Sequence, residues 1–147
     1  MSYTNYRSQP TQMADLSYGT TKELESKPIL EKFLNTELVL KGGFHPFDFH
    51  NKTNTIYLEL KSRRFKHDKY PTTMIGLNKV EYAKKNPGCD YWFAYNFEDG
   101  VWAVKYDEAL FDSFEVKTDF RRSYRADCAN YNQRIVYIPI ANLTKIL

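Results

Sequence analysis

Few cysteines and no long apolar run characterise this chain of 147 residues. Its two cysteines, Cys89 and Cys128, are too few for a disulfide framework, and neither lies in a spacing typical of zinc ligands. We therefore expect two free thiols in a reducing compartment. No stretch approaches the roughly 18 apolar residues of a membrane span, and the polar start MSYTNYRSQPTQ lacks the apolar region of a signal peptide. We expect a soluble protein that is neither secreted nor membrane-bound.

Several catalytic signatures are missing as well. No serine or cysteine lies in a nucleophile-elbow pattern, and no glycine-rich phosphate loop is present. The histidines, His45, His50 and His67, have no metal-ligand spacing among themselves. We expect them at the surface or behind the ligands of a site. These absences argue against covalent catalysis by an activated serine or cysteine and against a Walker-type nucleotide site.

What is present supports one packed domain. Hydrophobic residues make up 42% of the chain and aromatic residues 16%, which is enough for a sizeable core. The net charge of +3 excludes neither a nucleic-acid partner nor a neutral one. Residues 1–18 are polar and aperiodic, so we interpret them as a flexible N-terminal arm, followed by a single domain over residues 19–147.

Apolar periodicity predicts an alternation of helices and strands. TTKELESKPILEKFLN (20–35) is typical of a helix, and Thr20 with Glu23 fits a capping box; at Pro28 the helix either kinks or begins. The remaining expected elements are strands in ELVLK (37–41), FHPFDFH (44–50) and NTIYLELKSRR (54–64), a helix in MIGLNKVEYAKKN (74–86), an aromatic hairpin in CDYWFAYNFEDGVWAVKYDE (89–108), a helical turn in ALFDSF (109–114) and a strand in RIVYIPI (134–140). This order predicts the α/β class.

The strand NTIYLELKSRR carries charge on one face. Side chains alternate along a strand, so Tyr57, Glu59 and Lys61 point one way while the neighbouring leucines point to the core. Asp48 precedes Glu59 by eleven residues, and the polar turn NKTN (51–54) would fold the two strands antiparallel. The two carboxylates would then converge beside a lysine. Magnesium prefers such oxygen ligands, and a lysine there can orient or deprotonate an attacking water.

Asp48 followed by Glu59-Leu60-Lys61 resembles the D…(D/E)-x-K signature of the PD-(D/E)XK nuclease superfamily, although PFD stands here in place of PD. The element order from about Gly19 to Tyr106 is similar to the core of that superfamily. The resemblance implies a restriction-endonuclease-like core with a central mixed sheet of four to six strands flanked by helices. It also implies a Mg²⁺- or Mn²⁺-dependent nuclease of the kind found among restriction enzymes, junction resolvases and phage exonucleases.

The resemblance further implies roles for particular residues. Asp48 and Glu59 would hold the metal and Lys61 would act on the water, with the Leu60 backbone carbonyl as a further ligand. A glutamate of the first helix completes the shell in several branches of the superfamily. GTTKE makes Glu23 our choice, ahead of Glu25 and Glu31, and Lys79 or Asn78 would serve as the polar residue from the second helix.

Basic residues follow the proposed catalytic strand and predict contacts with DNA phosphates. The first cluster, KSRRFKHDK, includes Arg63, Arg64 and Lys66, and arginine suits phosphate oxygens bidentately. The second comprises Lys117, Arg121, Arg122 and Arg125, with Tyr124 between them. The expected partner is DNA, double-stranded or branched. A homodimer would place two sites on two strands.

The sequence thus predicts a nuclease located in the cytoplasm or nucleus, or in a viral factory if the source is viral. Junction, flap, single-stranded and RNA substrates stay open. Two other interpretations make different predictions. A non-catalytic nucleic-acid-binding domain that kept the fold would bind DNA without cutting it. A structural or partner-binding protein with a coincidental signature would show neither DNA affinity nor its salt dependence.

Overall fold

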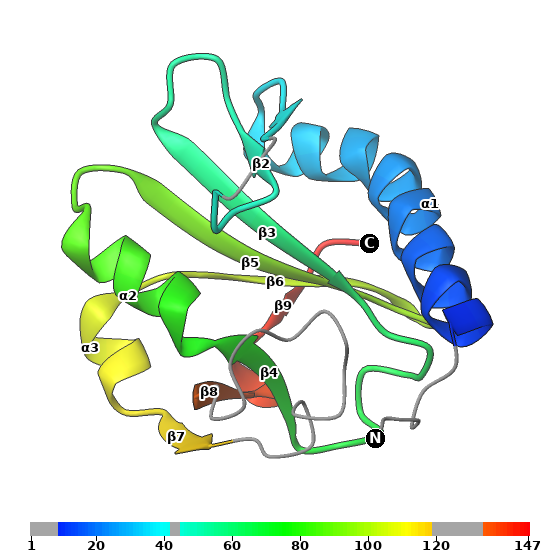
Figure 1. Cartoon of the computed structure of the whole chain (residues 1–147). Helices are drawn as coiled ribbons and strands as arrows, with labels where there is room; N and C mark the ends of the chain where they lie inside the picture. Colours follow the sequence, from blue (N-terminus) through cyan, green and yellow to red (C-terminus); the bar gives the residue numbers. More distant parts are fainter. Residues whose placement is uncertain (1–8, 42–44, 119–133) are drawn as a thin grey trace.

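The computed structural model describes residues 9–41, 45–118 and 134–147, with the backbone alone described for residues 9–20 and for Lys22. The described residues form two sheets, three α-helices and a short 3-10 turn (Figure 1). In chain order the elements are α1 (Gln9–Leu34), β1 (Val39–Leu40), β2 (Phe49–His50), β3 (Ile56–Ser62), β4 (Thr72–Gly76), α2 (Leu77–Lys85), β5 (Asp90–Phe97), β6 (Gly100–Lys105), α3 (Glu108–Asp112), β7 (Glu115–Thr118), β8 (Arg134–Pro139), η2 (Ile140–Asn142) and β9 (Thr144–Lys145).

The larger sheet has six strands in the order β1-β2-β3-β5-β6-β9. β3 and β5 pair in parallel, and every other neighbouring pair of this sheet is antiparallel. Parallel neighbours need a crossover connection, which here passes through β4 and α2. The predicted α/β class and the predicted mixed central sheet are therefore confirmed, with six strands at the upper end of the expected range.

Helices cover both faces of this sheet (Figure 1). On the α1 face, Leu30 of the helix packs in one buried cluster with Leu58 and Leu60 of β3 and Ala94 of β5. The opposite face is rich in aromatic residues and packs against α2, α3 and the second sheet. Its buried cluster includes Phe47, Tyr57, Val80, Tyr91, Phe93, Tyr95, Phe111 and Ile138. The sheet is thus buried on both faces, and a charged side chain of β3 must lie within this packing.

The second sheet, in the order β4-β8-β7, differs from the prediction. Met74 and Ile75, which the apolar periodicity assigned to the start of a helix, lie in β4, and α2 begins only at Leu77. The alternating burial of β4 explains the difference, because Thr73 and Ile75 face the core while β8 supplies its hydrogen-bonding partner. That partner lies about sixty residues further along the chain, where local periodicity gives no signal.

The first helix is longer than predicted. α1 begins at Gln9, so residues 9–18 of the predicted arm are helical, whereas residues 1–8 lie outside the described residues. Thr20 is inside the helix and does not cap it, and the helix continues through Pro28 instead of beginning there. A helix propagates more easily than it nucleates, and the packing of its last turns on the sheet supports the earlier ones. Despite this length, none of the described helices is apolar enough to cross a bilayer.

Candidate active site

Glu59 and Lys61 project from β3 toward α2. The leucines on either side of Glu59 belong to the cluster on the α1 face, so the strand alternation directs Glu59 and Lys61 to the other face. Glu59 is 2% exposed, and the Lys61 side chain is 36% exposed. Lys61 Nζ lies 3.2 Å from Glu59 Oε2. A buried carboxylate therefore lies beneath a lysine that still reaches solvent.

The turn between β2 and β3 brings Asp48 next to Glu59. The antiparallel register of β2 and β3 pairs Phe49 with Leu58, and continuing it by one residue places Asp48 opposite Glu59. Asp48 Oδ2 accepts a hydrogen bond from the Leu60 amide at 3.1 Å. The predicted antiparallel fold across NKTN is confirmed.

The turn itself follows from two asparagines. The Asn51 side-chain oxygen accepts hydrogen bonds from the amides of Thr55 at 2.9 Å and Ile56 at 3.0 Å. Asn54 has a φ of 56°, a left-handed conformation that asparagine adopts more readily than most residues. This local chemistry reverses the chain at the position that sets the register of Asp48 against Glu59.

Lys79 enters the site from the first turn of α2. Its Nζ lies 3.5 Å from Glu59 Oε2 and donates a hydrogen bond to the Pro46 carbonyl. Both lysines thus approach the same oxygen of Glu59. The other oxygen, Oε1, is buried and has no hydrogen-bond partner among the described residues. Burial raises the pKa of Glu59 above its usual value. The positive charge of Lys61 lowers this pKa, the negative charge of Asp48 raises it, and the charge of Lys79 lowers it.

Glu23 is the first-helix glutamate that the structure brings to this carboxylate pair. Its pKa is raised by burial and further by the negative charges of Asp48 and Glu59, while Lys61 lowers it. Glu31, an alternative in the sequence analysis, instead accepts hydrogen bonds from the Leu38 amide at 2.8 Å and from Lys27 at 3.1 Å. The Leu38 amide lowers the pKa of Glu31, which therefore serves the junction of α1 with β1.

Glu25, the other alternative, lines a different groove. That groove has a volume of about 500 Å³ and runs between α1, the β5–β6 turn and the end of the chain, where Leu147 contributes to its wall. The charge of Glu23 interacts with those of Asp48 and Glu59.

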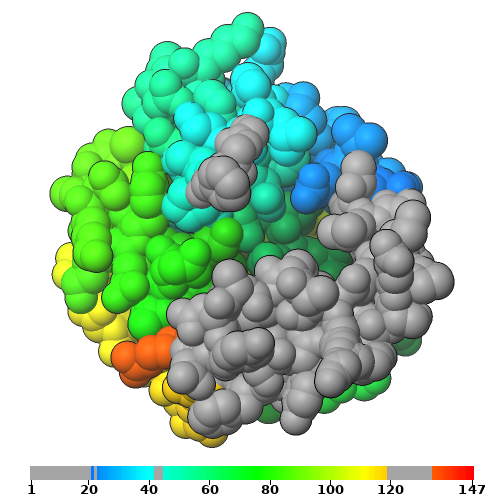
Figure 2. All heavy atoms as spheres, viewed as in Figure 1, coloured from blue at the N-terminus to red at the C-terminus, as the bar shows by residue number. Residues whose placement is uncertain are grey.

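Glu23 comes from α1, Asp48 from the position before β2, and Glu59 from β3. α1, the β2–β3 segment and α2, which supplies Lys79, are all visible on the face shown in Figure 2, in blue, cyan to green, and green. Glu23, Asp48 and Glu59 offer only oxygen donors, and their mutual repulsion favours a cation between them. Glu59 Oε1, which has no partner among residues 9–41, 45–118 and 134–147, is consistent with a cation nearby, because a buried carboxylate oxygen without a donor is costly. The oxygen donors of the three carboxylates are of the type that a hard divalent cation such as Mg²⁺ prefers, although the ligand atoms of the three residues do not all lie within 4.8 Å of one another.

The predicted phosphate-binding residues are placed differently from one another. Lys79 lies inside the carboxylate site, whereas Asn78, its alternative, is exposed. The Arg63 guanidinium lies over the Tyr95 ring at 5.9 Å, immediately beyond β3. Arg64 and Lys66 are exposed in the following loop. The predicted residues Arg121, Arg122 and Arg125 lie outside the described residues.

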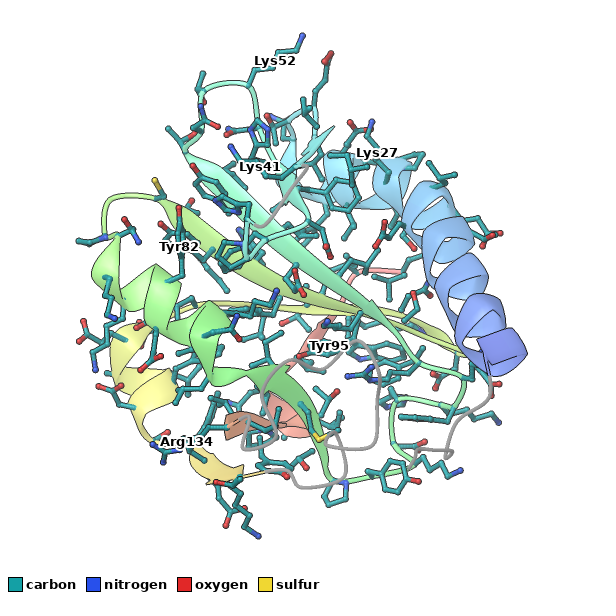
Figure 3. The ribbon with its side chains drawn as sticks, viewed as in Figure 1. Lys27, Lys41, Lys52, Tyr82, Tyr95 and Arg134 are labelled. Atoms are coloured by element: carbon teal, nitrogen blue, oxygen red, sulfur yellow. The ribbon has the colours of Figure 1, made fainter. Side chains whose placement is uncertain are left out.

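Aromatic residues pack on the face of the sheet that α2 and β4 cover. Tyr82 of α2 and Tyr95 of β5 are labelled in Figure 3, and the Tyr95 hydroxyl donates a hydrogen bond to the Met74 carbonyl of β4 at 2.9 Å. His45 belongs to this packing. Its Nδ1 accepts a hydrogen bond from the Phe47 amide at 3.0 Å, its Nε2 lies 3.2 Å from the Tyr82 hydroxyl, and its ring stacks on Tyr57. Burial lowers the pKa of His45, and the Lys41 charge lowers it further. His45 therefore positions the segment before Asp48.

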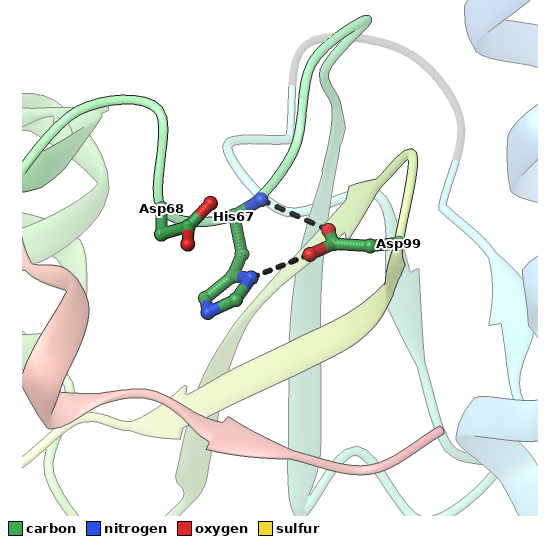
Figure 4. A group of neighbouring side chains, drawn as sticks. All are labelled: His67, Asp68 and Asp99. Atoms are coloured by element: carbon green, nitrogen blue, oxygen red, sulfur yellow. Dashed lines mark hydrogen bonds and ion pairs between the residues drawn. The ribbon is translucent and has the colours of Figure 1, made fainter.

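His67 was not identified as a candidate metal ligand by its sequence spacing. The structure groups it with Asp68 and Asp99, and one ligand-bearing atom of each lies within 4.8 Å of the others (Figure 4). His67 and Asp99 come from two loops 32 residues apart, so no local motif joins them. Trp102, whose ring stacks on His67, gives no sequence signal for the grouping either.

A scan against protein-family models gives no match for this chain, and a search of curated proteins gives none.

Proposed function

We propose that this protein is a Mg²⁺- or Mn²⁺-dependent nuclease that hydrolyses DNA phosphodiester bonds and has a restriction-endonuclease-like core. The observation that carries the proposal is the difference in surroundings between the two carboxylate oxygens of Glu59. Oε2 faces Lys61 and Lys79, whereas the buried Oε1 has no partner in the described part of the chain. An oxygen in that state, beside two further carboxylates, supports binding of a hard cation.

Asp48, Glu59 and Glu23 would hold the ion, and the Leu60 carbonyl remains the predicted fourth protein ligand. When bound, a divalent ion of this kind offsets charge on a phosphodiester and increases the acidity of a water. Asp48 is held by the Leu60 amide, so its orientation is set before any ligand binds. Glu59 is fixed in the same way by its two lysines.

The two lysines have different surroundings and, in this proposal, different roles. Lys79 is anchored at the Pro46 carbonyl and therefore orients Glu59 and the segment before Asp48. Lys61 is more exposed and has Glu59 as its partner, so its ammonium group can reach a phosphate oxygen or the attacking water. In the proposed reaction, water adds to phosphorus and the bond to the leaving oxygen breaks. The Lys61 ammonium donates hydrogen bonds that orient the water or the phosphate oxygen, the proton lost by the water passes to solvent, and the leaving oxygen takes a proton from solvent.

The basic residues of the loop after β3 favour a nucleic acid as the substrate. Arg63, Arg64 and Lys66 follow the catalytic strand directly, so a chain of phosphates that crosses the site would meet them next. Contacts of this kind set affinity without reading base sequence. The proposal therefore predicts a salt-sensitive, sequence-tolerant affinity for DNA.

A cleavage assay tests the proposal. Labelled linear, nicked, branched and single-stranded DNAs, with an RNA for comparison, are incubated with Mg²⁺, Mn²⁺, Ca²⁺ or EDTA. Cleavage with Mg²⁺ or Mn²⁺ that EDTA stops, and that Glu59→Gln abolishes, is expected. Glu37→Gln is the matched control, because Glu37 is 73% exposed and pairs with Lys52 away from Glu59. DNA binding without cleavage under all conditions would favour the non-catalytic alternative, and absence of both would overturn the proposal.

A further inference from the structure

A histidine is held in a fixed orientation away from the carboxylate site. The His67 amide donates a hydrogen bond to Asp99 Oδ1 at 2.9 Å, and His67 Nδ1 lies 2.6 Å from Asp99 Oδ2 (Figure 4). The imidazole also stacks on the Trp102 indole, with ring centroids 4.1 Å apart and an interplanar angle of 15°. Partial burial would raise the pKa of Asp99, but the hydrogen bonds from His67 hold it below its usual value.

These contacts determine which ring nitrogen is available to a ligand. An ionised carboxylate can only accept hydrogen bonds, so His67 Nδ1 must carry the proton that it shares with Asp99. In the neutral imidazole, the lone pair is then on Nε2. A carboxylate that fixes a histidine in this way is the usual outer partner of a metal-binding imidazole, because it sets the tautomer and increases ligand basicity.

A carboxylate is adjacent to this imidazole. Asp68 is exposed and follows His67 in the chain, and it completes the group whose ligand-bearing atoms lie within 4.8 Å of one another. This group is separate from the candidate active site. Glu59 pairs with Phe93 of β5, whereas Asp99 comes after the end of that strand at Phe97. The intervening strand alone covers about 13 Å at the usual rise per residue.

We propose that His67 Nε2 and the Asp68 carboxylate bind a divalent transition-metal ion of the zinc type, with Asp99 as the residue that positions the imidazole. Imidazole nitrogen favours Zn²⁺, Co²⁺, Ni²⁺ and Cu²⁺, whereas Mg²⁺ favours oxygen donors alone. Water would complete the coordination at this partly exposed position. The ion would bind the β3–β4 loop, which the hydrogen bonds of His67 to Asp99 already join to the β5–β6 turn. This proposal stands independently of the nuclease proposal.

Trp102 provides a direct readout of binding. The chain has two tryptophans, and replacing Trp92 by phenylalanine leaves Trp102 as the sole reporter. Because the His67 ring stacks on Trp102, a paramagnetic ion at Nε2 should quench its fluorescence. Titration of the Trp92→Phe protein with Co²⁺ or Ni²⁺ should give saturable quenching, and Zn²⁺ should reverse it. An excess of Mg²⁺ should not.

Variants decide whether these residues are responsible. His67→Gln should abolish saturable quenching, and Asp99→Asn should weaken binding by about 10- to 100-fold, the usual effect of losing such an outer partner. His50→Gln is the control and should bind normally, because the His50 ring contacts the Asn51 carbonyl elsewhere. Asp68→Asn should also weaken metal binding. Because Asp68 is exposed, this variant should fold and still tests the proposal if His67→Gln does not fold. Equal quenching in folded His67→Gln, or in both Asp68→Asn and Asp99→Asn, would overturn the proposal.

Discussion

Asp48 holds the backbone of the strand that carries Glu59. Its Oδ2 accepts a hydrogen bond from the Leu60 amide at 3.1 Å, and its own carbonyl accepts one from the Lys41 amide at 2.6 Å. The residue therefore joins β1, β2 and β3 at the point where the carboxylates meet. A structural role and a metal-binding role coincide in one side chain, and substitutions can separate them.

Asp48→Asn keeps a side-chain oxygen that can accept the Leu60 hydrogen bond but loses the negative charge. We expect a nearly unchanged melting temperature and loss of metal-dependent cleavage. Asp48→Ala should also lose cleavage and should destabilise the fold by about 1–3 kcal/mol, because the amide loses its acceptor. Thermal unfolding and cleavage measured on both variants test this expectation. Normal turnover by Asp48→Asn would contradict the assignment.

The buried carboxylate predicts an unusual pH dependence. Burial raises the pKa of Glu59 above its ordinary value of 4.5, so its protonated form favours the folded state. The resulting stability is fully present below the ordinary pKa and is lost as pH rises through the raised value. In EDTA, lowering the pH from neutral should therefore shift the melting temperature of the wild type upward relative to that of Glu59→Gln.

A bound metal ion should offset the loss of stability that ionised Glu59 causes at neutral pH. An ion that binds the folded state with an ionised Glu59 stabilises that state by mass action. Mg²⁺ or Mn²⁺ should raise the melting temperature of the wild type and leave that of Glu59→Gln unchanged. Glu37→Gln, at an exposed position, should respond as the wild type does. A difference between wild type and Glu59→Gln that varies neither with pH nor with metal would contradict the assigned role of Glu59.

Local rules predicted the parts of this molecule that local chemistry controls. The period-two alternation placed Glu59 and Lys61 on one face, and the asparagine-rich turn brought Asp48 opposite Glu59. The aromatic hairpin of β5 and β6 was also predicted, because its turn residues and strand pattern are adjacent in the chain.

Features set by distant partners were not predictable. β4 depends on β8, and the pairing of His67 with Asp99 depends on two loops that meet only in the folded chain. The same holds for the state of Glu59. Its near-complete burial, and the approach of Lys79 to the same oxygen as Lys61, result from the packing of α2 on the sheet. The residue types are readable in the sequence, whereas the burial of Glu59 and the lack of a partner for its Oε1 among the described residues are properties of the tertiary structure.

The loop after β3 predicts how DNA affinity responds to salt. Glu98 N donates a hydrogen bond to the Phe65 carbonyl, so this loop lies at the β5–β6 turn, and Arg64 and Lys66 are exposed there. Arg64→Ala and Lys66→Ala should each weaken binding about equally for different sequences. Each should also reduce the slope of log affinity against log salt by about one. Lys105→Ala, at the far end of β6, is the control. Binding isotherms at several salt concentrations decide the matter, and unchanged slopes would indicate a merely solvated loop.

Lys61 provides the sharpest test of the chemistry. Its ammonium group lies 3.2 Å from Glu59 Oε2 and remains partly exposed. Lys79 contacts the same carboxylate oxygen. Lys61→Ala leaves Glu59 with Lys79 as a partner, so the fold and the DNA affinity should persist. Cleavage should fall by orders of magnitude, the pattern of an interaction made mainly in the transition state. Lys61→Arg should restore little activity, because a guanidinium differs in shape and presents its N–H donors in other directions.

Single-turnover cleavage of a saturating DNA complex separates this role from binding, with affinity measured in Ca²⁺ and stability by thermal unfolding. Lys105→Ala is the matched control, since Lys105 is also an ion-paired lysine on a strand of the same sheet, 3.2 Å from Asp90. It should cleave at the wild-type rate, because exposed ion pairs contribute about 1 kcal/mol or less to stability and nothing to the reaction. If Lys61 served only as a partner for Glu59, Lys61→Ala would lower the melting temperature and leave the single-turnover rate near normal. A near-normal rate would remove Lys61 from the proposed mechanism.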